Sequence, residues 1–220
     1  LTQVIVDPYD DAFHHPVKVI GRYMDAKEAE AEEQKGNYVK EEPGKGYRRI
    51  VAAPMPKSIV EIDAIKTLVQ NDQVVIACGG GGIPVLQQGN ELKGASAIIE
   101  KDYASGKLAE GVDADILMIL TNDKMVDIDR DTEHPRFLEH ITVEEAKEHI
   151  AADQFGVNSM LPKICASVDF ITAGRGRSAI ITNLENAIDA GATQITLSAD
   201  RGGIAQLQIA DNGTGIEAEY

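Results

Sequence analysis

The residues with the clearest chemical potential are four consecutive glycines that follow a short apolar run at 74–78: Gly79, Gly80, Gly81 and Gly82. Glycines in tandem let the backbone turn sharply and bring several N–H groups close to an anion. Their context, CGGGGIPV, has neither the Lys-Ser/Thr of a Walker A loop nor the GxGxxG spacing of a dinucleotide-binding turn. The segment is therefore an anion-binding loop or a tight turn against a neighbouring backbone, and we favour the loop.

Two lysines stand where predicted helices begin. Lys101 and Asp102 follow a predicted strand end, and Lys163 follows Pro162 in SMLPKIC. A Lys at a helix N-terminus opposes the helix dipole, unless an anionic ligand lies there. These lysines are either phosphate-binding groups or exposed side chains of ordinary capped helices. The five histidines show no ligand spacing, so no metal site is expected among them: His14, His15, His134, His140 and His149.

The elements that would position these residues are read from the hydrophobic pattern. Strands are predicted at the start of the chain (TQVIVD) and over 74–78, 97–99, 115–121 and 178–183; helices are predicted over 60–70, 102–110, 141–152 and 162–172. Apolar strands that alternate with amphipathic helices predict an α/β fold with a mainly parallel sheet. Ligands in such sheets bind at the carboxyl ends of the strands, which would bring the glycines, Lys101 and Thr121 to one edge.

The first part of the chain has a different texture. A turn-rich start is followed by a helix-favouring acidic stretch at 25–35 and by a polar segment with Gly and Pro. We expect three parts: an N-terminal segment with a small subdomain at 1–58, an α/β core at 59–197 and an atypical tail at 198–220. Lys18 lies in the first part, as do Arg48 and Arg49, whose adjacency suits oxyanion binding.

Composition excludes several classes of function. The formal net charge is −15, from 36 acidic and 21 basic residues, which repels nucleic acids and acidic membranes. Two cysteines, Cys78 and Cys165, cannot build a disulfide framework or a zinc site. No apolar stretch approaches the roughly 20 residues of a membrane helix, and no signal peptide opens the chain. We therefore expect a cytoplasmic location, with neither nucleic-acid nor membrane partners.

Taken together, these segments resemble the carbamate kinases, a family with the amino-acid kinase fold. The resemblance runs from about Gln3 to about Ala187 through VDPYDDAF, PVKVIG, GYRRIVAAPMPKSIVE, VVIACGGGGIPV, IIEKDYASGKLAE, ADILMILT, SMLPKICASVDF and AIITNLENA. It implies a three-layer αβα architecture with a small protruding subdomain. It also implies reversible phosphoryl transfer between ADP/ATP and carbamoyl phosphate/carbamate, with Mg²⁺ on the nucleotide phosphates. Exposed sheet edges make a homodimer the expected assembly.

The resemblance assigns a role to each candidate residue. Lys18 matches a subdomain lysine that reaches the carbamoyl phosphate, and Lys101 and Lys163 match lysines that neutralise the transferring phosphoryl group. Asp102 matches the acid that organises these lysines. The remaining matches lie around the nucleotide and its phosphates: Gly79, Gly80, Gly81, Gly82, Thr121, Ser159 and Met160.

Local departures from the family pattern keep a second interpretation open. Nothing in the chain corresponds to the family's N-terminal GGNAL loop. PTK is PVK at Val17, GSMGPK is NSMLPK with Asn158 and Leu161, and Asp127 stands where the family has an aromatic. The alternative is a catalytically inactive nucleotide-binding remnant or interaction module.

The tail is similar to another family. Residues 184–216 resemble the ATP-binding region of MutL-type mismatch-repair proteins, through an asparagine helix at Asn186 and the loop DNGTGI. Asp211, Gly213 and Gly215 match that loop, but Thr182 stands in place of the catalytic Glu. The tail is a chimeric addition, a working second ATPase or a terminal strand-turn-strand that completes the sheet edge. We favour the chimeric addition over a working ATPase.

Overall fold

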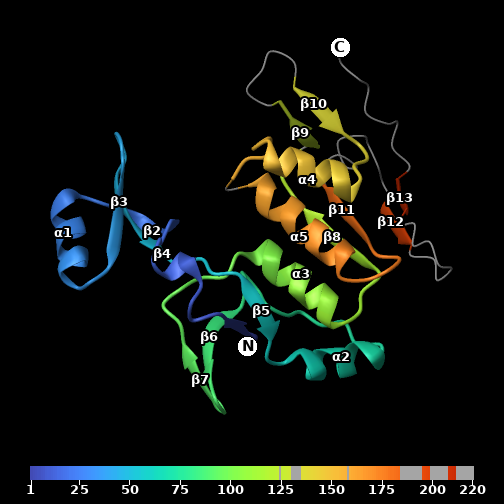
Figure 1. Ribbon diagram of the computed structural model, residues 1–220, viewed down its shortest axis with the longest axis horizontal. Helices are drawn as coiled ribbons and strands as arrows, with labels where there is room; N and C mark the ends of the chain where they lie inside the picture. The colour runs from blue at the N-terminus through green and yellow to red at the C-terminus, as the bar shows by residue number, and fades with distance from the viewer. Residues whose placement is uncertain (124, 130–134, 158, 184–194, 199–207, 212–220) are drawn as a thin grey trace. The chain divides into compact units, whose positions relative to one another are not determined.

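The computed structural model of the chain divides into two compact units, Leu1–Gly111 and Val112–Tyr220 (Figure 1). It describes residues 1–123, 125–129, 135–157, 159–183, 195–198 and 208–211. No helix within these residues is long and apolar enough to cross a membrane. The three parts expected from the sequence, 1–58, 59–197 and 198–220, stay a prediction.

The first unit contains a four-stranded sheet in the order β5-β1-β6-β7. The strands are β5 (Pro56–Ile59), β1 (Gln3–Val6), β6 (Ile83–Gln88) and β7 (Glu91–Gly94). β1 runs parallel to β6 and antiparallel to β5, while β6 and β7 form a hairpin. The predicted N-terminal strand is thus one of the two inner strands of this sheet, and its Val4 and Val6 are almost fully buried.

Two helices accompany this sheet. They are α2 (Ile62–Gln70) and α3 (Lys101–Gly111), which confirm the helices predicted over 60–70 and 102–110. α3 packs on β5 and against α2. A Cβ at Gly111 would lie 2.5 Å from the Ile62 side chain, so the two helices touch where α3 has no side chain.

A small antiparallel sheet in the order β2-β4-β3 makes up the rest of the first unit. Its elements are β2 (Lys18–Met24), α1 (Ala26–Gln34), β3 (Tyr38–Glu42) and β4 (Gly46–Val51), preceded by a 3₁₀ turn η1 (Asp11–Phe13). α1 begins with a capping box, in which Asp25 and Glu28 each accept a hydrogen bond from the other's backbone N–H. The predicted acidic helix is thereby confirmed.

The buried strand predicted over 74–78 is wrong. These residues have no regular secondary structure, and the side chains of Val74 and Ile76 are 98% and 96% exposed. A β-branched apolar run becomes a strand only when a neighbouring strand accepts its backbone hydrogen bonds, and no described strand pairs with this one. The weaker strand expected at 97–99 is reduced to an isolated bridge between Ala52 and Ala97.

The second unit is built on a parallel pair of strands covered by helices. The elements are β8 (Ile116–Leu120), β9 (Val126–Ile128), β10 (Arg136–Leu138), α4 (Val143–Ala151), α5 (Met160–Thr172) and β11 (Ser178–Thr182). β8 pairs with β11 over five residues, β9 and β10 form a hairpin, α5 packs on both parallel strands and α4 packs on α5. The α/β class is confirmed, as are both strands and both helices predicted in this unit. α5 starts two residues before Pro162, whose missing N–H falls in the first helical turn.

The tail contributes one more described pair, β12 (Ile195–Ser198) and β13 (Gln208–Asp211), which run antiparallel. They form their own two-stranded sheet. Of the residues in the MutL-type comparison, Thr182 and Asp211 are described, whereas Asn186, Gly213 and Gly215 lie outside the described residues.

Candidate functional site

The glycine segment turns by a combination of positive φ angles and short-range hydrogen bonds. Cys78 has φ 62°, a conformation that is unusual for a residue with a Cβ. The Gly79 N–H donates to the Ala77 carbonyl and the Gly81 N–H to the Cys78 carbonyl, both at 2.8 Å. Burial raises the pKa of the Cys78 thiol, which keeps it protonated and unsuited to act as a nucleophile.

The four glycines differ in what surrounds them. A Cβ at Gly81 would lie 2.1 Å from the Ile99 carbonyl oxygen, and one at Gly82 would lie 2.5 Å from Val4. A Cβ at Gly79 or Gly80 would have no neighbouring atom within 4 Å, and both residues are exposed. Gly81 and Gly82 therefore allow close packing against the protein, whereas Gly79 and Gly80 present open backbone.

Lys101 and Asp102 lie at the start of α3, as the sequence predicts. The Glu100 carbonyl accepts the hydrogen bond from the Ala104 N–H, so Glu100 is the N-cap residue of this helix. Lys101 is exposed, while Asp102 is only 5% exposed. A carboxylate in the first turn is favoured by the helix dipole. The exposed Lys beside it is free to meet an anion.

Lys18 reaches the same helix start from the small sheet. It opens β2, and its ammonium forms an ion pair with the Glu100 carboxylate. The base of the small sheet is also tied to this segment through its backbone, because the Ile98 N–H donates to the Ala52 carbonyl. Lys18 and Lys101 are thus brought together at the start of α3, where Gly81 packs against Ile99. Glu100 was missed in the sequence, although its place beside Lys101 in IIEKD was a usable signal.

The adjacent arginines are used structurally, in contrast to the oxyanion role their sequence suggests. Both lie on β4 rather than in a loop. Arg48 stacks on Tyr23 and donates to the Gly21 carbonyl, and Arg49 donates to the Asn37 side chain. They hold the small sheet and α1 together.

In the second unit, Thr121 lies directly after β8. Its hydroxyl donates to the Asp123 carboxylate at 3.0 Å, and its N–H donates to the Thr182 carbonyl at the end of β11. Asn183, which is 7% exposed, donates to the Asn122 carbonyl. The carboxyl ends of the two parallel strands are therefore joined by hydrogen bonds. Asp123 and Asn183 were missed because both read as ordinary turn residues.

Lys163 lies in the first half of α5 and is 8% exposed. Its carbonyl accepts a hydrogen bond from the Ser167 hydroxyl. Met160 is 1% exposed, and Ser159 is the exposed N-cap residue, without a side-chain capping bond. Met160 is thus a core residue, and Ser159 is the accessible member of this group. Asn158, which departs from the family pattern, lies outside the described residues.

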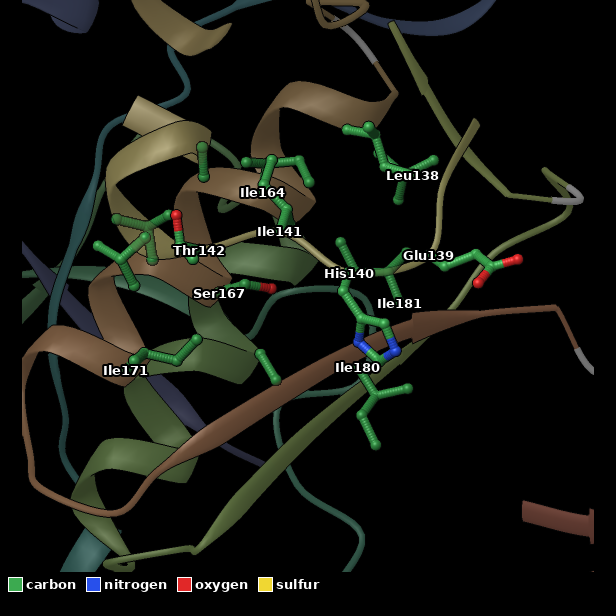
Figure 2. A pocket seen from close by; sticks show the side chains of 15 residues that line it. Leu138, Glu139, His140, Ile141, Thr142, Ile164, Ser167, Ile171, Ile180 and Ile181 are labelled. Atoms are coloured by element: carbon green, nitrogen blue, oxygen red, sulfur yellow. The ribbon is translucent and has the colours of Figure 1, made fainter. Parts of the chain in front are cut away.

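The second unit also contains an apolar cavity of about 370 Å³, shown in Figure 2. Its walls come from α4, α5 and β11, through side chains such as Val143, Ile164 and Ile180. The hydroxyl of Ser167 is already bonded to the Lys163 carbonyl, and the Glu139 carboxylate points away from the isoleucines. None of the predicted site residues lines this cavity. Its lining includes His140 but neither Lys nor Arg.

Known proteins place this geometry in a family. The sequence model of the family described as "Amino acid kinase family" matches residues 19–183. The chain is 48% identical over 186 residues to carbamate kinase 1 of Enterococcus faecium, covering 84% of this chain and 59% of the relative. It is 46% identical over 187 residues to the carbamate kinase-like protein YqeA of Escherichia coli K12, covering 85% of this chain and 60% of the relative. The chain thus spans about three fifths of the length of these relatives.

Solved structures agree with the sequence relatives. The carbamate kinase of Giardia lamblia bound to AMP-PNP superimposes with a TM-score of 0.77 at 38% identity, covering 86% of this chain and 60% of that one. The same enzyme bound to citric acid gives a TM-score of 0.73. The family match includes residues of both units described above and ends at residue 183. The chain therefore belongs to the amino acid kinase family.

Proposed function

We propose that this chain is the larger part of a carbamate kinase-like phosphotransferase. Its reaction moves a phosphoryl group between the ADP/ATP pair and the carbamate/carbamoyl phosphate pair. The observation that carries the proposal is the ion pair between Lys18 and Glu100, which brings Lys18 to the residue before Lys101 at the start of α3. The carbamate kinases among its relatives support the choice of substrate.

The chemistry requires positioning and charge stabilisation rather than a covalent intermediate. A phosphoryl group in transfer spreads negative charge over its three outer oxygens while two oxygens lie in line on either side. Lys101 and Lys163 would stabilise that charge, and Lys18 would hold the carbamoyl phosphate end. The match to the carbamate kinases assigns the open backbone at Gly79 and Gly80 to the phosphates, and it assigns Thr121 and Ser159 to nucleotide binding.

The nucleotide is ATP or ADP in this proposal, in keeping with the AMP-PNP-bound relative. Mg²⁺ would neutralise part of the phosphate charge when bound. No group of three or more His, Cys, Asp or Glu side chains in the described part of the chain could hold a metal ion. Mg²⁺ is usually held by substrate phosphates and one or two carboxylates, and Asp102 beside Lys101 is the carboxylate that we propose for this role. Neither Cys78 nor Cys165 forms a disulfide bond within the described part of the chain.

The test is ATP formation from Mg-ADP and carbamoyl phosphate by the purified, folded chain. Lys101→Ala should lower kcat/KM by at least about 100-fold, because a cation is lost from the developing charge. Lys107→Ala is the matched control, since Lys107 lies on the same helix and pairs with Glu110 instead. Equal losses in both variants would remove Lys101 from the site.

Folded protein without turnover would favour the binding-remnant alternative. ADP binding then separates the outcomes, because Lys101→Ala should still weaken affinity by about 1–3 kcal/mol if the nucleotide site is intact.

A further inference from the structure

We propose that Glu100 is a positioning residue that holds the Lys18 ammonium over the start of α3 and releases it to the anionic substrate. The inference rests on the proposed phosphotransferase function and assigns Glu100 a role in how the phosphorylated substrate binds. Neither residue is fully exposed: the side chains of Lys18 and Glu100 are 28% and 20% exposed. Partial burial reduces solvent screening, so this pair interacts more strongly than surface pairs do.

Glu100 is held rigidly from both sides. Its carbonyl accepts the first hydrogen bond of α3, from the Ala104 N–H at 3.1 Å. The residue before it, Ile99, is 3% exposed, and its carbonyl lies so close to Gly81 that no Cβ would fit between them. Glu100 therefore offers a carboxylate at a fixed place between the glycine segment and the helix start.

Lys18 is held mainly at its backbone. It opens β2, where it pairs with Val51 of β4, and the following Ala52 is bridged to Ala97. The small sheet is thereby fixed at its base, but a lysine side chain has several rotatable bonds beyond that point. The ion pair with Glu100 selects one direction for the ammonium, toward the start of α3.

Three charged side chains lie near the start of α3: Lys18, Glu100 and Lys101. A bound anion would change how they interact. Lys18 is matched by Glu100, and the ammonium of the exposed Lys101 forms no ion pair with another residue described here. A phosphorylated substrate at Lys101 would add negative charge beside the Glu100 carboxylate. That charge both repels Glu100 and attracts Lys18. The ammonium would then exchange one anionic partner for another, with little change in its own desolvation.

This exchange predicts opposite effects on binding and on turnover. Glu100→Gln removes a competing carboxylate, so carbamoyl phosphate should bind about three- to tenfold more tightly. The same change removes the ion pair that orients the Lys18 ammonium, so kcat should fall about tenfold or more. Glu100→Asp keeps the charge and should restore most of the wild-type behaviour. A merely structural role would not move affinity and kcat in opposite directions.

The decisive experiment is a double-mutant cycle measured by calorimetric titration of the folded chain with carbamoyl phosphate. The variants are Glu100→Gln, Lys18→Met and the pair together. Tighter binding in Glu100→Gln that disappears in the Lys18→Met background is the expected result. Glu110→Gln is the matched control, because it removes the same charge from the far end of α3, where it pairs with Lys107 at 2.8 Å.

Urea unfolding of the same four proteins separates this inference from the proposed function. The ion pair should appear as a coupling of about three- to tenfold in the unfolding equilibrium constant, whether or not the chain binds carbamoyl phosphate. Coupling without any binding would contradict the function and with it the exchange. Equal tightening in Glu100→Gln and Glu110→Gln would overturn the role of Glu100, because the effect would then be one of net charge.

Discussion

Gly81 occupies the most constrained backbone position of the candidate site. Its φ is +140°, and a Cβ would lie 2.1 Å from the Ile99 carbonyl oxygen and 3.0 Å from its carbonyl carbon. Gly81→Ala should therefore destabilise the chain by about 2–4 kcal/mol, since backbone must move to remove the clash. Urea unfolding measures the difference.

Gly80 provides the control for this prediction. Nothing lies within 4 Å of its Cβ position, and its φ is not positive. Gly80→Ala should change stability by less than about 0.5 kcal/mol. Similar losses at both positions would mean that the whole segment resists a side chain, rather than Gly81 alone.

The sequence predicts the importance of this glycine run but not the division of labour within it. Four identical residues in a row carry no signal that distinguishes close packing from open backbone. The distinction comes from Ile99 and Val4, which approach the run from other segments. The same limit applies to Lys18, whose partner Glu100 comes from a distant helix start. Residue types could be predicted, whereas pairings across the fold could not.

Among the elements, α4 tests how far a local capping signal stabilises the second unit. The Thr142 hydroxyl accepts from the Glu145 N–H at 3.2 Å, and the Glu145 carboxylate accepts from the Thr142 N–H at 2.8 Å. Thr142→Ala should cost about 1 kcal/mol of stability, measured by urea unfolding at pH 7. Thr172→Ala is the control, because the Thr172 hydroxyl donates to the Val168 and Asp169 carbonyls at the C-terminal end of α5 and caps no helix N-terminus. An equal loss in the control would assign the effect to a lost hydroxyl rather than to the cap.

The same capping box makes stability depend on pH. The Thr142 backbone N–H, and then its hydroxyl, hold the pKa of Glu145 below its usual value. A carboxylate whose pKa is lowered by folding stabilises the protein above its unfolded pKa of about 4.3 and loses that effect as the pH falls through the folded pKa. Glu145→Gln should thus be less stable than wild type at pH 7 and converge with it as the pH falls below the folded pKa of Glu145. A constant difference across this range would contradict the assignment.

Elements with their own local signals could be predicted, and elements that need a distant partner could not. The helices at 62–70 and 143–151 carry periodic apolar positions, and α4 has its cap in the sequence. The run at 74–78 has equally clear β-branched character, yet it is exposed because no described strand pairs with it. Hydrophobic pattern alone does not supply a hydrogen-bonding neighbour.

At the scale of the whole molecule, an apolar run and a large net charge have opposing effects on association. Val74 and Ile76 are almost fully exposed, and the half-exposed Leu68 and Val69 precede them in the chain. An extended segment with unpaired backbone groups and exposed apolar side chains favours pairing with a strand of another molecule. The formal charge of −15 repels a second copy, and salt screens that repulsion. The expected homodimer should therefore form more readily as salt rises.

Sedimentation velocity over a range of protein concentrations tests this expectation. The wild-type chain should associate more strongly in about 0.5 M than in about 0.05 M NaCl, because the Debye length shrinks from above 10 Å to a few ångströms. Val74→Ser with Ile76→Ser should weaken association at least about tenfold, since each copy loses apolar surface that pairing would bury. Val157→Ser is the control, an apolar side chain 70% exposed in the second unit. Association that survives the double substitution but not the control would assign the contact to the second unit and leave 74–78 without a role in self-association.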